Sequence, residues 1–305
     1  MKPRPVNLAA SVHQRLLNQA RATDRPFNEI LQYFAMERFL YRLSKSPRGG
    51  SFVLKGGLLL ALWRVSVTRA TKDIDLLGHV PNDVDGVVVL MRDACSQAVE
   101  RDGVEFDPAS VVGERIAEEA EYEGVRVRFR GRLGNARLTL QVDVGFGDAV
   151  VPGPVEAEYP TILDLPPPLV RAYTRESVVA EKFHTMVRRG LLNSRLRDYF
   201  DVWALSRQFD FEGPLLARAV TETFARRQSE VPAASPSLTD EFAADPARKA
   251  QWRGFLRRSR LEGVPQDLGE VVRGVAAFLG PVATALHEGV EFPRRWRAPG
   301  PWSPA

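Results

Sequence analysis

The sequence predicts an α+β protein, with a sheet domain followed by a helical domain. Short apolar or alternating segments of strand type are mixed with helical segments from about residue 52 to residue 146. Beyond Pro166-Pro167-Pro168 only helical periodicity continues. Since consecutive prolines favour a break between elements, we expect domains over residues 1–165 and 166–305.

The composition is that of a folded globular protein. The chain has 305 residues, of which 44% are hydrophobic and 26% charged, so a packed core is feasible and global disorder is excluded. The formal net charge is +4. This basic balance weakly favours a polyanionic partner such as RNA.

The single cysteine, Cys95, excludes an intrachain disulfide and a zinc site built on cysteines. The four histidines show no metal-ligand spacing. The N-terminal segment Met1 to Pro5 is followed by a polar helical stretch and not by an apolar signal core. No run is expected to approach the length of a membrane span. We therefore expect a cytoplasmic protein with no membrane partner.

Periodicity predicts the individual elements. Helices are expected over residues 8–22, 26–43, 58–64, 84–100, 175–189, 192–209, 214–228, 239–258 and 267–288. Strands are expected over residues 52–54, 74–77, 103–112, 124–130 and 138–146. The tail from Pro293, rich in Pro, Arg and Trp, is expected to be irregular.

Two carboxylates, Asp73 and Asp75, are the first candidate site residues. Their i, i+2 spacing on a strand places both on one face, where both can reach one divalent cation or bridge two. A bound cation would relieve the repulsion between them, and nucleotidyl transfer uses such a cation to orient a triphosphate. The plainer interpretation is a solvated strand end with two surface acids.

A glycine pair lies upstream of these acids. Gly56-Gly57 follows the expected strand 52–54 and Lys55, and precedes an expected helix. Glycines allow backbone N–H groups to approach phosphate oxygens, and a helix N-terminus favours an anion. An ordinary strand-to-helix turn would have the same sequence.

Asp143 is the third candidate acid. It lies between Val142 and Val144 on an alternating strand, so it faces away from both. It is either simply exposed or the third member of a cluster with Asp73 and Asp75.

These motifs together resemble a known signature. The run Lys55-Gly56-Gly57, Thr71-x-Asp73-Ile74-Asp75 and Val142-Asp143-Val144 resembles the polymerase-β-like nucleotidyltransferase superfamily. Two further blocks narrow the resemblance to the AbiEii family of abortive-infection toxins, the toxic halves of type IV toxin–antitoxin pairs. These blocks are Glu176-Ser177 with Ala180-Glu181-Lys182-Phe183-His184, and the run from Arg195 to Leu205. The resemblance covers roughly residues 28–210.

The resemblance implies a polymerase-β-like sheet domain and metal-dependent transfer of NMP from an NTP, with tRNA as the acceptor in some relatives and unknown acceptors in others. We expect an RNA acceptor here. The resemblance also implies Mg²⁺ or Mn²⁺ as cofactor and an antitoxin as partner. The implied metal ligands are Asp73, Asp75 and Asp143, and the implied catalytic residues are Asp73, Asp75, Lys182 and Asp198. The implied nucleotide-binding residues are Lys55, Gly56, Gly57, Arg69, Thr71 and Arg195. Thr71 stands where the family often has Ser, so a hydroxyl is retained.

Lys182 is unusual on physical grounds alone. It falls inside the apolar stripe that includes Val178 and Met186, so it must extend its amine to solvent or find an anion. Asp198, on the next helix, is the best resident anion. We expect Lys182 to pair with it in the empty enzyme and to contact phosphate when NTP binds. Asp198 would pair with Lys182 or act as a base or orienter, and Arg195 would pair with Asp198 or contact phosphate. Replacing Lys182 with Ala is expected to affect folding little.

Three other polar residues near Lys182 are expected to be structural. Asp201 is four residues after Arg197, which predicts an ion pair along the helix. Glu181 is expected to face solvent. His184 is not expected to be a catalytic base.

Two other functions remain open on the same fold. One is NTP-dependent phosphoryl transfer, or modification of a protein target. The other is a binding module without activity, which the intact set of Asp73, Asp75 and Asp143 disfavours. Because the acids and Lys182 come from different predicted domains, we expect the active site in a cleft between the domains.

Overall fold

The structure is a computed structural model that describes residues 7–67, 69–118 and 122–305. Contacts divide the chain into two compact units. Unit 1 comprises Met1–Leu62, Ala70–Gly147 and Val155–Ala172, and unit 2 comprises Trp63–Arg69, Asp148–Pro154 and Tyr173–Ala305. Unit 1 contains a mixed sheet with helices and unit 2 is mainly helical, which confirms the predicted α+β class.

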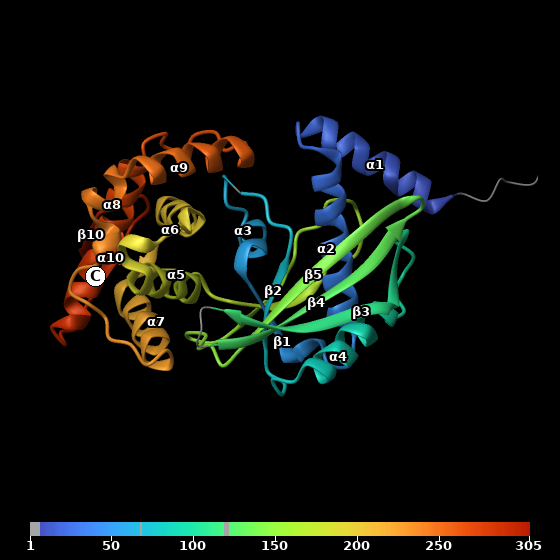
Figure 1. Ribbon diagram of the computed structural model, residues 1–305, viewed down its shortest axis with the longest axis horizontal. Coiled ribbons are helices and arrows are strands. Elements are labelled where there is room, and N and C mark those ends of the chain that lie inside the picture. The colour runs from blue at the N-terminus through green and yellow to red at the C-terminus, as the bar shows by residue number, and fades with distance from the viewer. Residues whose placement is uncertain (1–6, 68, 119–121) are drawn as a thin grey trace, which may run out of the picture. The chain divides into compact units, whose positions relative to one another are not determined.

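Unit 1 is built on a seven-stranded sheet (Figure 1). Its strands are β1 (Phe52–Lys55), β2 (Ile74–Gly78), β3 (Val104–Glu118), β4 (Tyr122–Leu133), β5 (Ala136–Phe146), β6 (Val155–Glu158) and β7 (Leu169–Ala172). The order across the sheet is β3-β4-β5-β2-β1-β7-β6. The pairs β2–β5 and β1–β7 are parallel and the others are antiparallel.

Unit 1 also contains several helices. They are α1 (Leu8–Ala22), α2 (Phe27–Lys45), α3 (Leu59–Leu62) and α4 (Val84–Ser96), with short 3₁₀ turns η1 (Gly49–Ser51) and η2 (Gly56–Leu58). Helix α4 packs on β3 and β4, and α2 contacts β5 and β7. Alternation on β5 decides which side is covered. Leu140 and Val142 are buried, whereas Thr139 on the opposite side is exposed.

Unit 2 is a set of packed helices with a small sheet. Its helices are α5 (Arg175–Arg189), α6 (Leu196–Gln208), α7 (Gly213–Arg226), α8 (Asp240–Ala244), α9 (Pro246–Ser259) and α10 (Leu268–His287), with 3₁₀ turns η3 (Gly190–Leu192) and η4 (Pro236–Leu238). Its strands are β8 (Phe211–Glu212), β9 (Arg294–Trp296) and β10 (Trp302–Pro304), in the order β10-β9-β8. Helix α10 packs on α6, α7 and α8.

Two helix predictions need correction. The helix expected over residues 58–64 is only the turn η2 followed by the single turn α3. The helix expected over residues 239–258 is interrupted at Asp245. There the Asp245 side chain accepts a hydrogen bond from the Arg248 N–H (2.9 Å), and Pro246 opens α9. An Asp cap followed by Pro is a helix start, so one apparent helix is two.

The tail from Pro293 is not irregular as expected. It forms the antiparallel pair β9–β10, in which Trp296 and Trp302 are partners. Both indoles are buried, and Trp302 stacks on Phe278 of α10 with ring centroids 5.6 Å apart. The tail therefore adds aromatic area to the core of unit 2.

Helix α10 corrects the expectation that no run approaches a membrane span. By length and composition it could cross a membrane, but 56% of its apolar window is buried inside the structure. It is the central helix of unit 2, because it contacts α6, α7, α8 and α9.

Candidate active site

The sheet of unit 1 brings the three predicted acids together. In the parallel pair β2–β5, Asp75 lies in register with Asp143, so both side chains are on the same face. Asp73, two residues before Asp75, shares that face. One carboxylate oxygen from each of the three lies within 4.8 Å of the others. The structure thus forms the three-carboxylate cluster that the sequence left as one of two alternatives.

Gly56 is packed against this cluster. Its φ is +72°, and a Cβ at this position would lie 1.8 Å from Asp75 Oδ2. Lys55, the last residue of β1, is opposite Asp75 in the antiparallel pair β1–β2. Only glycine therefore allows the chain to turn here with Asp75 in place.

The helix expected after the glycine pair is too short to act as a dipole. Gly57 lies in η2, which has three residues, and α3 adds four more. The field of a helix terminus comes from several aligned peptide units, which this segment lacks. The glycine pair is explained by its contact with Asp75 rather than by a helix N-terminus.

Thr71 orients Asp73. Its hydroxyl donates a hydrogen bond of 2.7 Å to Asp73 Oδ1, and its own N–H donates to the Tyr33 hydroxyl at 2.9 Å. Tyr33 belongs to α2, so the loop before β2 is fixed to a helix of the same unit. Because Oδ1 of Asp73 is held by this hydrogen bond, the orientation of Oδ2 is fixed as well.

Arg126 balances the charge of Asp143 and was not predicted. It is opposite Asp143 in the β4–β5 pair, and its Nε and Nη2 donate to the two carboxylate oxygens at 2.8 and 2.7 Å. Hydrogen bonding to Asp143 raises the pKa of the Arg126 guanidinium. A sequence signal was available, because Arg126 alternates with Val125 and Val127 on a strand and so shares the face of Asp143.

The cluster has the chemistry of a site for a hard divalent cation. All three potential ligand atoms are carboxylate oxygens, the donors that Mg²⁺ and Mn²⁺ prefer. Three carboxylates and one guanidinium leave an excess of negative charge, which a cation would offset. Because Gly56 has no side chain, the Asp75 carboxylate can stay in this cluster. The residues present therefore fit such a cation.

Lys182 forms an ion network with two buried carboxylates in unit 2. Its Nζ lies 2.7 Å from Asp198 Oδ1 and 2.8 Å from Asp201 Oδ2. Arg195 Nε lies 3.0 Å from the second oxygen of Asp198. The predicted pairing of Asp198 with Lys182 and with Arg195 is confirmed. These two carboxylates offset the desolvation cost of a lysine inside an apolar stripe.

Asp201 does not pair with Arg197 as expected. Its two oxygens accept hydrogen bonds from Arg69 Nε and Nη2, both at 2.8 Å, in addition to the contact with Lys182. Asp201 is 1% exposed, whereas Arg197 lies on the exposed face of α6. Spacing along a helix predicted a local pair, but the partner from residues 63–69 of the same unit displaces it.

The cations control the ionisation of both carboxylates. Burial alone would raise the pKa of Asp201, but Arg69 and Lys182 outweigh it and hold this pKa at about 2. Burial opposes ionisation of Asp198 in the same way, and Lys182 and Arg195 still keep its pKa below the ordinary value. Both carboxylates are therefore ionised at neutral pH.

Glu181 does not face solvent as expected. Its Oε1 accepts a hydrogen bond of 3.1 Å from the Tyr173 hydroxyl and lies 3.8 Å from Arg227 Nη2. Arg227 also contacts Asp148 at 3.3 Å and the His184 Nδ1 at 3.2 Å. These residues form a second polar cluster of unit 2, and His184 is one of its buried structural members.

The predicted site residues thus fall into two groups. The first, in unit 1, consists of Lys55, Gly56, Gly57, Thr71, Asp73, Asp75 and Asp143. The second, in unit 2, consists of Arg69, Lys182, Arg195 and Asp198. Arg69 and Thr71 are two residues apart in the chain but belong to different groups.

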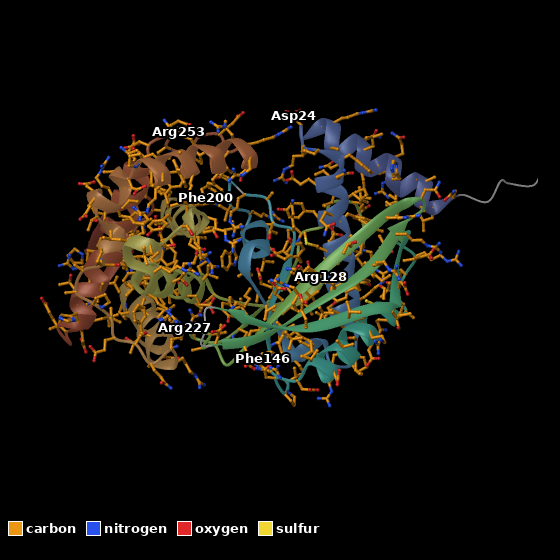
Figure 2. The ribbon with its side chains drawn as sticks, viewed as in Figure 1. Asp24, Arg128, Phe146, Phe200, Arg227 and Arg253 are labelled. Atoms are coloured by element: carbon orange, nitrogen blue, oxygen red, sulfur yellow. The ribbon has the colours of Figure 1, made fainter. Side chains whose placement is uncertain are left out.

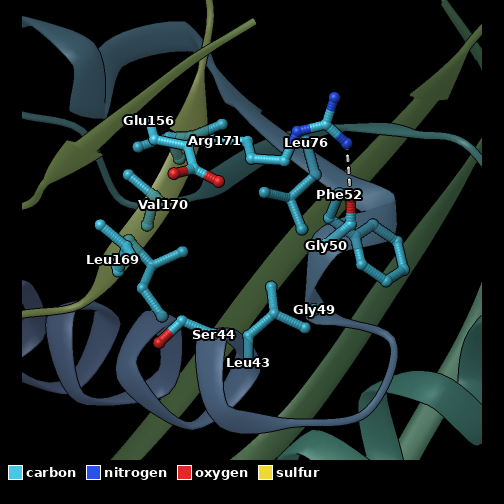
Figure 3. A pocket seen from close by; sticks show the side chains of 12 residues that line it. Leu43, Ser44, Gly49, Gly50, Phe52, Leu76, Glu156, Leu169, Val170 and Arg171 are labelled. Atoms are coloured by element: carbon cyan, nitrogen blue, oxygen red, sulfur yellow. Dashed lines mark hydrogen bonds between the residues drawn. The ribbon is translucent and has the colours of Figure 1, made fainter.

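A cavity of about 160 Å³ lies on the other side of the unit 1 sheet (Figure 3). Its walls include Leu54 and Leu76, which alternate with Lys55 and Asp75 along β1 and β2. Neighbours along a strand face opposite sides, so the cavity and the carboxylates are separated by the sheet. None of the predicted site residues lines it.

Comparison with known proteins agrees with these motifs. A family model described as "Nucleotidyl transferase AbiEii toxin, Type IV TA system" matches residues 38–273. The match includes both the carboxylate cluster of unit 1 and the ion network of unit 2. No curated protein matches the chain.

Two crystal structures from Helicobacter pylori are also similar. One is of a proposed nucleotidyltransferase, which is 16% identical with a TM-score of 0.43, and the match covers 86% of this chain and 96% of that chain. The other is of the protein JHP933, which is 15% identical with a TM-score of 0.42, and the match covers 86% of this chain and 92% of that chain.

Proposed function

Because the chain belongs to the AbiEii family of nucleotidyl transferase toxins of type IV toxin–antitoxin systems, we propose that it transfers NMP from an NTP to an RNA acceptor with the help of a divalent cation. The observation that carries this proposal is the cluster of Asp73, Asp75 and Asp143, whose oxygens lie within 4.8 Å of one another. We propose Mg²⁺ or Mn²⁺ as the cation. We also propose that the protein is a cytoplasmic toxin and that an antitoxin regulates it.

The proposed reaction is a displacement at the α-phosphorus of the NTP. An acceptor hydroxyl oxygen forms a bond to this phosphorus, the bond to the bridging β-phosphate oxygen breaks, pyrophosphate leaves, and the hydroxyl proton passes to solvent. A bound divalent cation would neutralise the charge that develops on the phosphate oxygens. The chain's own contribution is to hold the carboxylates in position. Thr71 fixes Asp73, Gly56 leaves room for Asp75, and Arg126 balances Asp143.

Lys182 is the proposed phosphate contact from unit 2. Asp198 and Asp201 direct its amine, and a triphosphate is a stronger anion that could share it. Asp198 is better suited to position Lys182 than to act as a base, because its lowered pKa makes it a weak proton acceptor at neutral pH. We propose that Lys182 and its partners in unit 2 act in the same reaction as the carboxylates of unit 1.

The other proposed nucleotide-binding residues differ in whether a carboxylate already occupies them. Lys55, Gly56, Gly57 and Thr71 are next to the carboxylates in unit 1. Arg69 and Arg195 each already contact a buried carboxylate, so an NTP phosphate must compete with Asp201 or Asp198 for them.

The position of the radioactive label tests the type of transfer. The purified chain is incubated with Mg²⁺, total RNA or total protein, and either each α-³²P NTP or γ-³²P ATP. Label from an α-³²P NTP on RNA is the expected result, with no label from the γ position. Label from γ-³²P ATP on either acceptor would support phosphoryl transfer. Label from an α-³²P NTP on protein alone would show that the acceptor is a protein and not RNA.

A further inference from the structure

Helix α9 concentrates positive charge in unit 2. Its sequence, PARKAQWRGFLRRS, contains Arg248, Lys249, Arg253, Arg257 and Arg258 and no acidic residue. These five charges exceed the formal net charge of the whole chain, which is +4, so the remaining residues have a formal net charge of −1. Helix α9 is therefore a local concentration of positive charge.

Three of these cations form a stripe on the exposed face of the helix. Lys249, Arg253 and Arg257 are four residues apart, and all three are exposed. With a rise of 1.5 Å per residue, successive members are separated by roughly 6 Å along the axis. Trp252 and Leu256, on an adjoining face of the helix, are buried, and α9 contacts α6, α8 and α10. Arg253 can be seen on the exposed face of α9 in Figure 2.

The α9 stripe (Lys249, Arg253 and Arg257) is unpaired in the part of the chain that the structure describes. Among the described residues, none of the three forms an ion pair or a hydrogen bond through its side chain. The arginines on β4 behave differently. Arg128 lies 2.8 Å from Glu114, and Arg130 lies 3.3 Å from Asp107. These two exposed arginines are matched with acids, whereas the cations of the α9 stripe are not.

Helix stability does not explain the stripe. A cation in the last turn, such as Arg257, interacts favourably with the helix dipole, but Lys249 is near the first turn, where the dipole disfavours a cation. Cations four residues apart also repel one another. Helix electrostatics alone therefore do not account for three cations in this row.

We infer that the α9 stripe binds the phosphodiester backbone of the acceptor RNA, an inference that rests on the proposed function. A row of evenly spaced cations suits a linear polyanion, because each can contact a phosphate without regard to base sequence. A lipid surface is a poorer fit, since Trp252 and Leu256 of α9 are buried in unit 2 and Phe255 is half-buried, so no large apolar side chain of this helix is fully exposed.

The test is binding of fluorescein-labelled bulk tRNA to the full chain without NTP, followed by anisotropy at several salt concentrations. The variant Lys249→Ala/Arg253→Ala/Arg257→Ala removes the stripe and keeps a good helix former at each position. The control variant Arg15→Ala/Arg21→Ala/Arg207→Ala removes three other exposed arginines, so it lowers the net charge equally. Circular dichroism and melting confirm that both variants are folded.

The stripe variant is expected to bind tRNA about 10-fold to 100-fold more weakly than the wild type. The slope of log K against log salt should fall by about 2 to 3, since each lost phosphate contact removes a little under one unit. The control should bind like the wild type. Equal weakening in both variants, or no weakening in the stripe variant, would overturn the inference. So would stripe-dependent binding to phosphatidylserine vesicles without stripe-dependent binding to tRNA.

This result is independent of catalysis. If no nucleotidyl transfer occurs but the stripe variant loses tRNA binding, the proposed function fails and the binding surface stands. If the stripe variant binds tRNA normally while the wild type transfers NMP to RNA, the proposed function stands and the α9 inference is wrong.

Discussion

A methyl group on Gly56 would lie 1.8 Å from Oδ2 of Asp75. The backbone at Gly56 has a φ of +72°, a region that residues with a side chain adopt at a cost of about 1 kcal/mol or more. One glycine thus combines an unusual turn with close approach to a proposed metal ligand. The turn after β1 and the direction of the Asp75 carboxylate depend on each other.

Gly56→Ala should therefore reduce NMP transfer at least about 10-fold, because Asp75 must move to avoid the new methyl group. Melting should also fall by a few degrees. Gly50→Ala is the matched control, because a Cβ there has nothing within 4 Å. Normal transfer by the Gly56 variant would mean that the direction of Asp75 does not matter for the reaction.

Thr71→Val should weaken the reaction by removing the hydroxyl that donates to Asp73 Oδ1 at 2.7 Å. Since valine has nearly the same shape, the fold should be retained, and a loss of about 10-fold in rate is expected. The Mg²⁺ concentration for half-maximal rate should rise, which a purely structural role would not cause. Thr71→Ser should restore wild-type Mg²⁺ dependence, and failure to do so would contradict this account of Thr71.

Lys182→Ala should lower transfer by a factor on the order of 10² or more, the scale lost with one preorganised charge donor. The structure changes the expectation for stability. Because Lys182 contacts both Asp198 and Asp201, its loss leaves each buried carboxylate with one cation fewer, at a cost on the order of 2 kcal/mol. Arg197→Ala is the control and should melt like the wild type, since Asp201 does not pair with Arg197. Wild-type turnover by the Lys182 variant would refute its catalytic role.

Glu37 should make stability depend on pH. Burial raises the pKa of its carboxyl to about 7, and Arg38, 2.8 Å away, only partly offsets this. A raised pKa means that the contribution is fully present below the unfolded value of 4.5 and is lost as pH rises through about 7. The free energy of unfolding should fall by up to about 3 kcal/mol between pH 5 and pH 8. Denaturation of Glu37→Gln should lack this fall, and an equal fall in the variant would assign it to another group.

Most of the secondary structure could be predicted because the apolar pattern is regular. The alternation of Leu138, Leu140, Val142 and Val144 fixes both the strand β5 and its buried face. Three short strands, β6, β7 and β8, were missed, since none of them is a continuous buried apolar run like that of β1. The β9–β10 pair was missed because its prolines suggested a loop, while its tryptophans form long-range contacts that no local pattern reports.

The site residues could be predicted only where their spacing within one segment determines their arrangement. Asp73 and Asp75 are two residues apart, and the sequence alone places them on one face. The partners of Asp143 and Asp201 depend on pairing between distant segments, which brings Arg126 across from one and Arg69 against the other. Local spacing suggested Arg197 for Asp201, and tertiary packing overrode it. The domain boundary at residues 165 and 166 and the roles of the site residues stay predictions.

The carboxylate cluster of unit 1 is proposed to drive NMP transfer. The most direct measurement is the initial rate of α-³²P NMP transfer to RNA as a function of Mg²⁺ concentration, for the wild type, Asp73→Ala and Asp93→Ala. Asp93 is an exposed acid of α4 in the same unit and serves as the control. We expect Mg²⁺-dependent transfer by the wild type and by Asp93→Ala, and none above background by a folded Asp73→Ala. Near-normal transfer by Asp73→Ala would contradict this proposal.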